Sequence, residues 1–269
     1  MPRRARLDAE LVRRGLARSR EHASALISEG RVTVRGMVAS KPATGVEAGE
    51  AIVVRGGEDD PNWASRGAHK LLGALEAFEP RGLSVVGKRC LDAGASTGGF
   101  TDVLLRRGAR TVVAADVGRG LLDWRLQTDD RVVVLDRTNV RNLTPEQIGG
   151  PVDLAVGDLS FISLRLVLPA LAACTLPGAD LVPMIKPQFE VGKERLGSGG
   201  VVRDPELRAQ AVLDVLASAA GLGLHVHGVV ASPLPGPSGN VEYFAWLRRE
   251  PGPGDVGDMV RNAVGEGPQ

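Results

Sequence analysis

The stretch CLDAGASTGGF, residues 90–100, decides the fold of this chain. It predicts a short buried strand, a glycine-rich turn and the start of a helix. Gly94, Gly98 and Gly99 allow backbone angles that a β-carbon would forbid, and they let a ligand approach the main chain closely. The free N–H groups at the start of the helix face such a ligand. The stretch therefore indicates a site for a nucleotide or nucleoside cofactor.

Strand and helix patterns alternate on both sides of this turn. Helices are expected at 65–78, 98–107, 120–127, 164–174 and 205–220, and strands at 89–93, 111–116, 132–135, 152–157, 180–185, 225–231 and 241–247. This alternation predicts an α/β fold with a doubly wound, mostly parallel, Rossmann-like sheet of seven strands. Residues 232–240, rich in proline and glycine, join the last two strands and predict a final antiparallel hairpin. The tail from Pro251 is expected to be frayed or partly helical.

The charge distribution separates the chain into two parts. Of its 269 residues, 43% are hydrophobic and 24% charged, as in ordinary soluble proteins, and the length suits one large domain and one small one. The net charge is +1, but residues 1–41 hold ten Lys and Arg against four Asp and Glu, a charge of +6 that leaves −5 for the remainder. A basic first part on a mildly acidic body indicates a module that binds a polyanion. Aromatic residues make up only 3%, which argues against an RNA surface built mainly on stacking.

Cysteine usage and hydropathy exclude several classes of protein. Cys90 and Cys174 lack the spacing of a metal or redox site, and Cys90 lies in an expected core strand. No run of roughly eighteen apolar residues marks a transmembrane helix. Arg3 and Arg4 are not followed by the apolar segment of a signal peptide. We therefore expect a cytoplasmic protein that holds no metal and does not enter the membrane.

The basic first part predicts two helices followed by short strands. Leu7, Leu11 and Val12 have helical spacing, and Ser19 can cap a second helix that ends at Gly30. Several arginines cluster where the two helices meet, and phosphate contact is the obvious use of such a cluster. Any one of them, taken alone, is better explained as part of a solvated surface. The set expected to bind RNA is Arg4, Arg6, Arg13, Arg14, Arg18, Arg20 and Lys41.

Residues 4–55 resemble the small RNA-binding module of ribosomal small-subunit protein S-four and of pseudouridine synthases. The resemblance is carried by R-L-D-x-x-L-x-x-x-G-L-x-x-S-R at 6–20, by A-x-x-L-I-x-x-G-x-V-x-V-x-G at 23–36, and by Lys41-Pro42. It implies that the two helices pack their basic faces on structured RNA.

A polar, acidic stretch broken by proline, EDDPN at 58–62, predicts a boundary between two domains. We expect a small α+β RNA-binding domain at 1–57, a linker at 58–64 and a second domain at 65–269. Trp63 stands next to this boundary, where an isolated tryptophan usually anchors the packing of two domains.

The spacing D-x-G-x-x-x-G-G at 92–99 resembles motif one of S-adenosylmethionine (SAM) methyltransferases. Asp116 ends the next strand, where an acid can bind both ribose hydroxyls of a nucleoside cofactor. Asp136 and Asn139 follow the third strand, where they can contact the adenine or the ribose. We predict SAM as the cofactor, held by Asp92, Gly94, Ser96, Gly98, Gly99, Phe100, Asp116, Asp136, Asn139 and Asp158.

Four charged residues are expected to meet at one edge of the sheet. Asp158 and Lys186 follow the fourth and fifth strands, and parallel strands form sites at their carboxyl ends. Glu242 begins the last strand, whose start lies at the same edge if that strand is antiparallel. Lys70 stands in the helix before the first strand and reaches the edge only through tertiary packing. Each alone suits a surface charge, but four charges of alternating sign at one edge indicate a catalytic site.

This set of four resembles the Lys-Asp-Lys-Glu tetrad of FtsJ-like RNA 2′-O-methyltransferases. Longer strings resemble the TlyA family of ribosomal RNA methyltransferases, also called hemolysin A proteins: SRGAHK at 65–70, DAGASTGGFT at 92–101, DLSFIS at 158–163, IKPQFEVGK at 185–193 and PSGNVEYF at 237–244. The resemblance implies SAM-dependent methylation of cytidine 2′-hydroxyls in small- and large-subunit ribosomal RNA. The family's interdomain Arg-x-Trp is Pro61-x-Trp63 here, so the linker departs from the family pattern.

A ribose hydroxyl is a poor nucleophile and must lose its proton as it attacks a methyl group. We expect Lys186 to take that proton, with Lys70 favouring the neutral amine by charge repulsion and orienting the hydroxyl. Asp158 and Glu242 are expected to position the two amines, and the reaction needs no metal. The glycine-rich segment 192–200 suits a substrate lid and a flexible surface loop about equally well.

Three other readings compete with this one. The chain could be a SAM methyltransferase of a protein or small molecule, which the RNA-type module and the second lysine disfavour. It could be an RNA-binding ribosome assembly factor with a vestigial SAM pocket, which the intact glycines and tetrad disfavour. It could be a membrane-lytic hemolysin, for which the sequence offers no suitable apolar or amphipathic segment.

Overall fold

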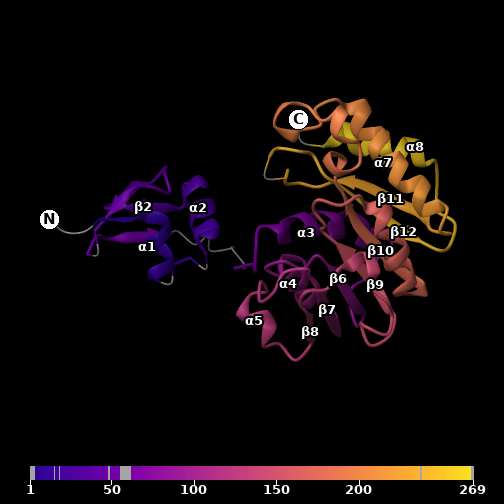
Figure 1. Ribbon diagram of the computed structural model, residues 1–269, viewed down its shortest axis with the longest axis horizontal. Helices are drawn as coiled ribbons and strands as arrows, with labels where there is room; N and C mark the ends of the chain where they lie inside the picture. The colour runs from indigo at the N-terminus through magenta and orange to yellow at the C-terminus, as the bar shows by residue number, and fades with distance from the viewer. Residues whose placement is uncertain are drawn as a thin grey trace. The chain divides into compact units, whose positions relative to one another are not determined.

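The computed structural model describes residues 4–267 except 15, 18, 48, 55–61 and 237. Arg18 and Pro61, singled out above, lie outside the described residues. The chain divides into two compact units, Met1–Asn62, drawn in indigo and violet in Figure 1, and Trp63–Gln269, drawn from purple through magenta and orange to yellow. Each unit is described by itself.

The first unit packs two helices on small sheets. Its elements are β1 Ala5–Arg6, α1 Leu7–Arg13, α2 Arg20–Ser28, β2 Val32–Val34, β3 Met37–Val38, β4 Gly45–Val46 and β5 Ile52–Val54. β2 pairs antiparallel with β3 and β5, and β1 pairs antiparallel with β4. Leu7, Leu11 and Ile27 are buried in its core. The Ser19 hydroxyl accepts a hydrogen bond from the backbone N–H of His22 at 3.1 Å, so the predicted cap of α2 is confirmed.

The second unit is built on one seven-stranded sheet. The strands are β6 Arg89–Ala93, β7 Thr111–Ala115, β8 Val132–Leu135, β9 Val152–Gly157, β10 Thr175–Ile185, β11 His225–Ala231 and β12 Tyr243–Arg248. Their order is β11-β12-β10-β9-β6-β7-β8, with β12 antiparallel to both neighbours and the pairs among β6 to β10 parallel. The α/β, Rossmann-like fold expected from the sequence is confirmed.

Helices cover both faces of this sheet (Figure 1). They are α3 Gly67–Phe78, α4 Gly99–Arg106, α5 Trp124–Gln127, α6 Leu168–Ala173, α7 Pro205–Ala220 and α8 Val256–Glu266. One buried cluster joins side chains of α3 and α4 to the sheet, and a second joins those of α6, α7 and α8. In the part of the chain that the structure describes, no helix is long and apolar enough to cross a membrane.

Several boundaries differ from those expected. The helix expected at 120–127 is only α5, because Gly120 has a φ of 62° and Asp123 caps the helix by accepting the N–H of Arg125. The helix expected from Ser65 begins at Gly67, and the Ser65 hydroxyl accepts the Gly67 N–H at 3.2 Å. Residues 256–266 of the tail form a regular helix, α8.

Other expected elements split or shift by a few residues. The helix expected at 164–174 is a 3₁₀ turn followed by α6. β10 begins at Thr175, five residues earlier than expected, with an irregular register before Asp180. Glu242 comes directly before β12 and does not begin it.

Candidate active site

The carboxyl ends of the parallel strands gather the predicted charged residues at one edge of the sheet. Asp158 follows β9 and Lys186 follows β10. Because β12 runs antiparallel, Glu242 just before its start lies at this same edge. Lys70 comes from α3, a helix that packs with α4 on one face of the sheet. The structure therefore brings together all four residues of the expected tetrad.

The four side chains form an alternating chain of charges. The Lys70 Nζ lies 2.5 Å from Glu242 Oε2, and the Lys186 Nζ lies 2.5 Å from Asp158 Oδ1 and 4.0 Å from Glu242 Oε1. Lys70, Lys186 and Glu242 are 5%, 7% and 1% exposed. Charges this deeply buried need partners, and here each lysine has a carboxylate. Carboxylates placed in this way can hold a lysine amine beside a substrate, and that amine can exchange a proton with the substrate.

Two polar neighbours of the tetrad were missed at the sequence level. The Lys186 Nζ donates a hydrogen bond to Ser160 Oγ at 2.9 Å. The Gln188 Nε2 donates to Glu242 Oε1 at 3.3 Å. Each of these residues follows a tetrad member by two positions, in the loop after its strand. That spacing was the available signal, since loop residues at this edge face the same space.

A buried carboxylate ties these two loops together. Glu190, in the loop after β10, accepts hydrogen bonds from the Ser163 hydroxyl and the Leu164 N–H, both at 2.6 Å, and from Arg165 Nε at 3.3 Å. Those three residues lie in the loop after β9. Burial raises the pKa of Glu190, and the hydrogen bonds from its partners oppose that rise. Glu190 therefore fastens the loop that carries Asp158 to the loop that carries Lys186.

The glycine turn after β6 meets the end of β7. The Asp116 carboxylate accepts the Ser96 N–H at 2.8 Å and the Gly118 N–H at 2.7 Å. A carboxylate has lone pairs left for further donors such as ribose hydroxyls. Gly94 has a φ of 84°, and a β-carbon there would lie 2.6 Å from the Asp158 carbonyl oxygen. Only glycine fits at this position.

Asp92 is the buried acid of the same turn. Its Oδ2 accepts a hydrogen bond from the Thr101 hydroxyl at 2.7 Å, and its Oδ1 has no partner among the described residues. Burial raises the pKa of Asp92 to about 7. An orphaned carboxylate oxygen at this strand end suits a cationic ligand group, so the residues present fit a cofactor that carries an amine.

The other glycines of the turn also serve packing. Gly98, with a φ of 95°, precedes α4, and a β-carbon there would overlap the side chains of Leu122 and Leu126. A β-carbon on Gly99 would lie 2.9 Å from the Ala68 N. From the sequence, these two glycines are expected only to let a ligand approach the backbone. The structure shows that both also let the start of α4 pack closely, Gly98 against Leu122 and Leu126 and Gly99 against Ala68.

Three further residues of the expected cofactor set have partners of their own. Phe100 is buried, and its ring centroid lies 5.9 Å from that of Phe244. Asp136 accepts the Gly120 N–H at 3.0 Å, and Asn139 accepts the Arg141 N–H at 3.1 Å. Asp136 and Asn139 are exposed beyond the end of β8, so they remain open to further contacts.

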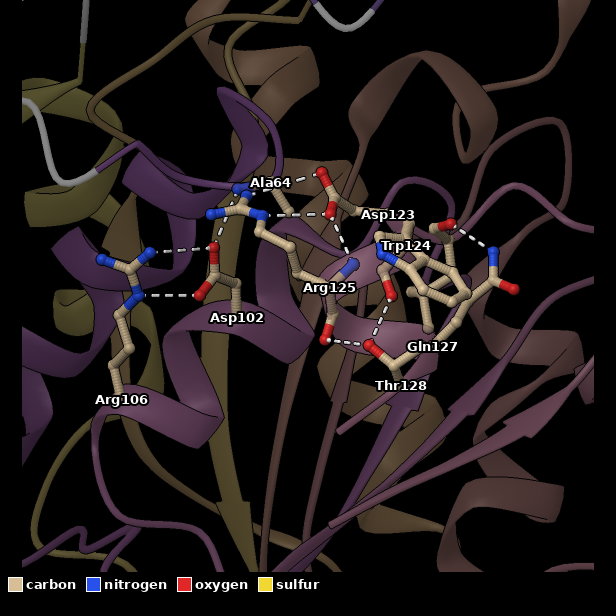
Figure 2. Close-up of polar contacts among 9 residues, drawn as sticks. Ala64, Asp102, Arg106, Asp123, Trp124, Arg125, Gln127 and Thr128 are labelled. Atoms are coloured by element: carbon tan, nitrogen blue, oxygen red, sulfur yellow. Dashed lines mark hydrogen bonds and ion pairs between the residues drawn. The ribbon is translucent and has the colours of Figure 1, made fainter. Parts of the chain in front are cut away.

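Helix α4 also holds the first residues of the second unit (Figure 2). Asp102 accepts the Ala64 N–H at 2.8 Å and the Arg106 Nε–H at 2.7 Å. The Arg106 guanidinium lies 4.3 Å from the centre of the Trp63 ring. Trp63 thus packs on a residue of its own unit, and the expected anchoring between the two domains stays a prediction. On α5, also drawn in Figure 2, Trp124 is 73% exposed.

The basic residues of the first unit surround two buried acids. Arg6 and Arg20 both lie 2.9 Å from Asp8, and together they hold its pKa well below the usual range. Arg13 and Arg14 lie 2.6 and 2.7 Å from Glu10 and lower its pKa to about 2.

These arginines differ in how far they are committed to the fold. Arg14 also donates to the carbonyl oxygens of Glu50 and Glu47 at 2.7 and 3.2 Å, and its side chain is 20% exposed against 62% for Arg13. Arg4 lies 3.5 Å from Glu47, and Lys41 is exposed.

Known proteins resemble both units of this chain, the one that carries the charged tetrad and the basic first unit. Residues 63–249 match the FtsJ-like methyltransferase family and residues 5–52 match the S4 domain. The chain is 61% identical, over the full length of both, to the 16S/23S rRNA (cytidine-2′-O)-methyltransferase TlyA of Mycobacterium tuberculosis. It is 41% identical to YqxC, a candidate rRNA methyltransferase of Bacillus subtilis, over 95% of this chain and 89% of the relative. A solved structure of a candidate hemolysin from Streptococcus thermophilus superposes with a TM-score of 0.77 at 36% identity, covering 99% of this chain and 96% of the other.

Proposed function

This chain belongs to the FtsJ-like methyltransferase family, and from that premise we propose that it transfers a methyl group from SAM to the 2′-hydroxyl of cytidine in ribosomal RNA. The substrate is RNA of the small subunit, the large subunit or both. The observation that carries the proposal is the buried alternation of Lys70, Glu242, Lys186 and Asp158 at the carboxyl edge of the sheet.

The glycine turn is the proposed cofactor site. Gly94 provides the close backbone approach, Asp116 offers its carboxylate to the ribose hydroxyls, and Asp92 offers its orphaned Oδ1 to the amine. Ser96, Gly98, Gly99, Phe100, Asp136, Asn139 and Asp158 shape the walls of this site. When bound, SAM would supply a methyl group on a sulfonium, whose methyl C–S bond breaks on transfer to release a neutral thioether, a good leaving group.

In the proposed chemistry one residue of the tetrad accepts a proton and the other three support it. Lys186, as the neutral amine, accepts the proton of the 2′-hydroxyl while the oxygen forms its bond to the methyl carbon. Asp158 holds the Lys186 amine directly, at 2.5 Å. Glu242 is bonded to Lys70 and lies 4.0 Å from Lys186, so it spaces the two amines and balances their charge. No step requires a metal ion.

The first unit is the proposed RNA-binding domain. Arg6, Arg13 and Arg20 each keep about half or more of the side chain exposed while a buried carboxylate orients the guanidinium. Oriented guanidiniums recognise phosphate well. We place this domain at 1–57, the linker at 58–64 and the catalytic domain at 65–269. The division of the chain after Asn62, which falls inside this linker, supports a boundary in that segment.

The test is methyl transfer to isolated ribosomal subunits from labelled SAM, followed by mass spectrometry of the RNA nucleosides. We expect a 2′-O-methylcytidine that is absent when protein is omitted. A methyl group on a base or on protein would overturn the proposed substrate. Full binding of subunits and SAM without any transfer would favour an assembly factor instead.

A further inference from the structure

Ser160 lies at the mouth of the tetrad and has no assigned role. Its hydroxyl accepts a hydrogen bond from the Lys186 Nζ at 2.9 Å, and the residue itself is exposed while Lys186 is buried. We propose that Ser160 is a positioning residue for Lys186, which fixes the direction of the amine so that its lone pair faces the substrate hydroxyl. The inference rests on the proposed function, in which Lys186 accepts a proton.

Among the residues that the structure describes, the contacts of the Lys186 nitrogen leave one position open. A tetrahedral nitrogen has three positions besides its bond to carbon. Asp158 Oδ1 at 2.5 Å and Ser160 Oγ at 2.9 Å occupy two of them. Glu242 Oε1 lies 4.0 Å away, beyond hydrogen-bonding distance. The Glu242 carboxylate is instead engaged by Lys70 and Gln188.

The two occupied positions of the Lys186 nitrogen determine where the lone pair of the neutral amine points. A neutral amine carries two N–H groups and one lone pair. When Asp158 and Ser160 each accept one N–H, the lone pair must take the third position. With Asp158 alone, the amine can rotate about its Cε–Nζ bond, and its lone pair then spends part of the time in the position that Ser160 now occupies. Misdirection of a catalytic group lowers the rate without weakening substrate binding.

The loop after β9 is built to keep Ser160 in place. The next residue, Phe161, has a φ of 63°, a left-handed conformation that is costly for a side chain of this kind. Two residues further on, Ser163 and Leu164 bond to the buried Glu190. The Phe161 ring also lies 5.3 Å from that of Phe189. These contacts hold the sharp turn that carries the Ser160 hydroxyl to Lys186.

The proposal also predicts the sign of a change in pH dependence. The charged groups near the Lys186 nitrogen are Asp158, Glu242 and, through Glu242, Lys70. The Ser160 oxygen accepts a hydrogen bond from the ammonium form and so stabilises it. Loss of this acceptor favours the neutral amine, and the acidic limb of the pH–rate profile should move to lower pH while the plateau falls.

The experiment compares Ser160→Ala, Ser160→Thr and Ser163→Ala in single-turnover methyl transfer with the full-length protein and isolated ribosomal subunits. We expect Ser160→Ala to lower the maximal rate about tenfold, with the SAM Kd and the apparent affinity for subunits within about twofold of wild type. Ser160→Thr keeps the hydroxyl and should restore most of the rate. Ser163→Ala removes one of the hydrogen bonds to Glu190 that hold the loop and leaves the acceptor of Lys186 present, so it measures loosening of the loop alone. Its rate should fall less than that of Ser160→Ala, and its acidic limb should stay at the wild-type pH.

The outcomes separate this inference from the proposed function. A Ser160→Ala enzyme with the wild-type rate would overturn the positioning role. So would a rate loss accompanied by an unmoved acidic limb, because that is the behaviour of general loop damage. Failure of the wild-type protein to methylate a 2′-hydroxyl would instead overturn the proposed function.

Discussion

The seven-stranded sheet carries a lysine paired with a buried carboxylate at each of its two edges, and only one edge resembles an active site. At the carboxyl edge Lys70 pairs with Glu242 at 2.5 Å. At the amino edge Lys88 pairs with Asp180 at 2.5 Å. The distances are the same and both carboxylates are buried. Pairing and burial therefore do not by themselves mark a site.

The difference lies in what else surrounds each pair. Asp180 also accepts a hydrogen bond from the Trp246 Nε1 at 2.7 Å and lies 3.4 Å from Arg248, so its oxygens are fully engaged. At the carboxyl edge, the contacts that the described residues make leave one position of the Lys186 nitrogen open. A closed set of contacts stabilises the fold, whereas an incomplete set is available for a substrate. The predictions below test this contrast, beginning with the largest expected effect.

Replacing Lys186 should remove activity and leave the fold nearly intact. Lys186→Ala should lower single-turnover methyl transfer by at least about a thousandfold, since no other amine occupies its position. Lys186→Arg should fail as well, because a guanidinium stays protonated at any working pH. SAM affinity, measured by calorimetry, should stay within a few-fold of wild type. Substantial activity in Lys186→Arg would exclude the role of proton acceptor.

Replacing Asp180 should give the opposite result. Asp180→Ala leaves Lys88 and the Trp246 N–H without their partner, and we expect the free energy of unfolding to fall by about 3 kcal/mol. Methyl transfer per folded molecule should stay near that of wild type. Urea unfolding measures the first quantity and activity at low temperature the second. Glu79→Ala, which breaks a partly exposed ion pair with Arg107, is the matched control and should cost less than about 1 kcal/mol.

Both lysine–carboxylate pairs lie on a framework that the sequence could predict. Strand and helix alternation sets the order of the parallel strands, and parallel strands place their loops at one edge. Asp158 and Lys186 could therefore be assigned to a common site. The loop contacts could not be predicted, because Ser160 and Glu190 act across two segments whose meeting depends on tertiary packing. The helix predicted at 120–127 was four residues too long for a local reason, the positive φ of Gly120, which helical periodicity does not reveal.

Asp92 extends this contrast, because it is a buried carboxylate with no cationic partner in the described part of the chain. Its pKa is raised to about 7 by burial, against an ordinary value of 3.8. Between these two values the folded chain holds a proton that the unfolded chain has released, so stability without cofactor must fall as pH rises through this window. From pH 5 to pH 7.5 we expect a loss of about 2 kcal/mol that Asp92→Asn does not show. Parallel curves for the two proteins would contradict the burial of an unpaired acid.

The smallest expected effect comes from two adjacent arginines of the first unit that share one carboxylate. Arg13 and Arg14 both pair with Glu10, but only Arg14 also binds the carbonyl oxygens of Glu47 and Glu50. Arg13, with its exposed guanidinium, should contact phosphate, so Arg13→Ala should weaken RNA binding about threefold and reduce the salt slope by about one. Arg14→Ala should instead lower the free energy of unfolding by about 1–2 kcal/mol, because three acceptors lose a donor. Fluorescence titration of ribosomal RNA at several salt concentrations, with thermal unfolding in parallel, measures both. If the salt slope falls for Arg14→Ala and not for Arg13→Ala, the more exposed arginine is not the one that contacts RNA. The distinction between closed and incomplete sets of contacts would then not apply to the first unit.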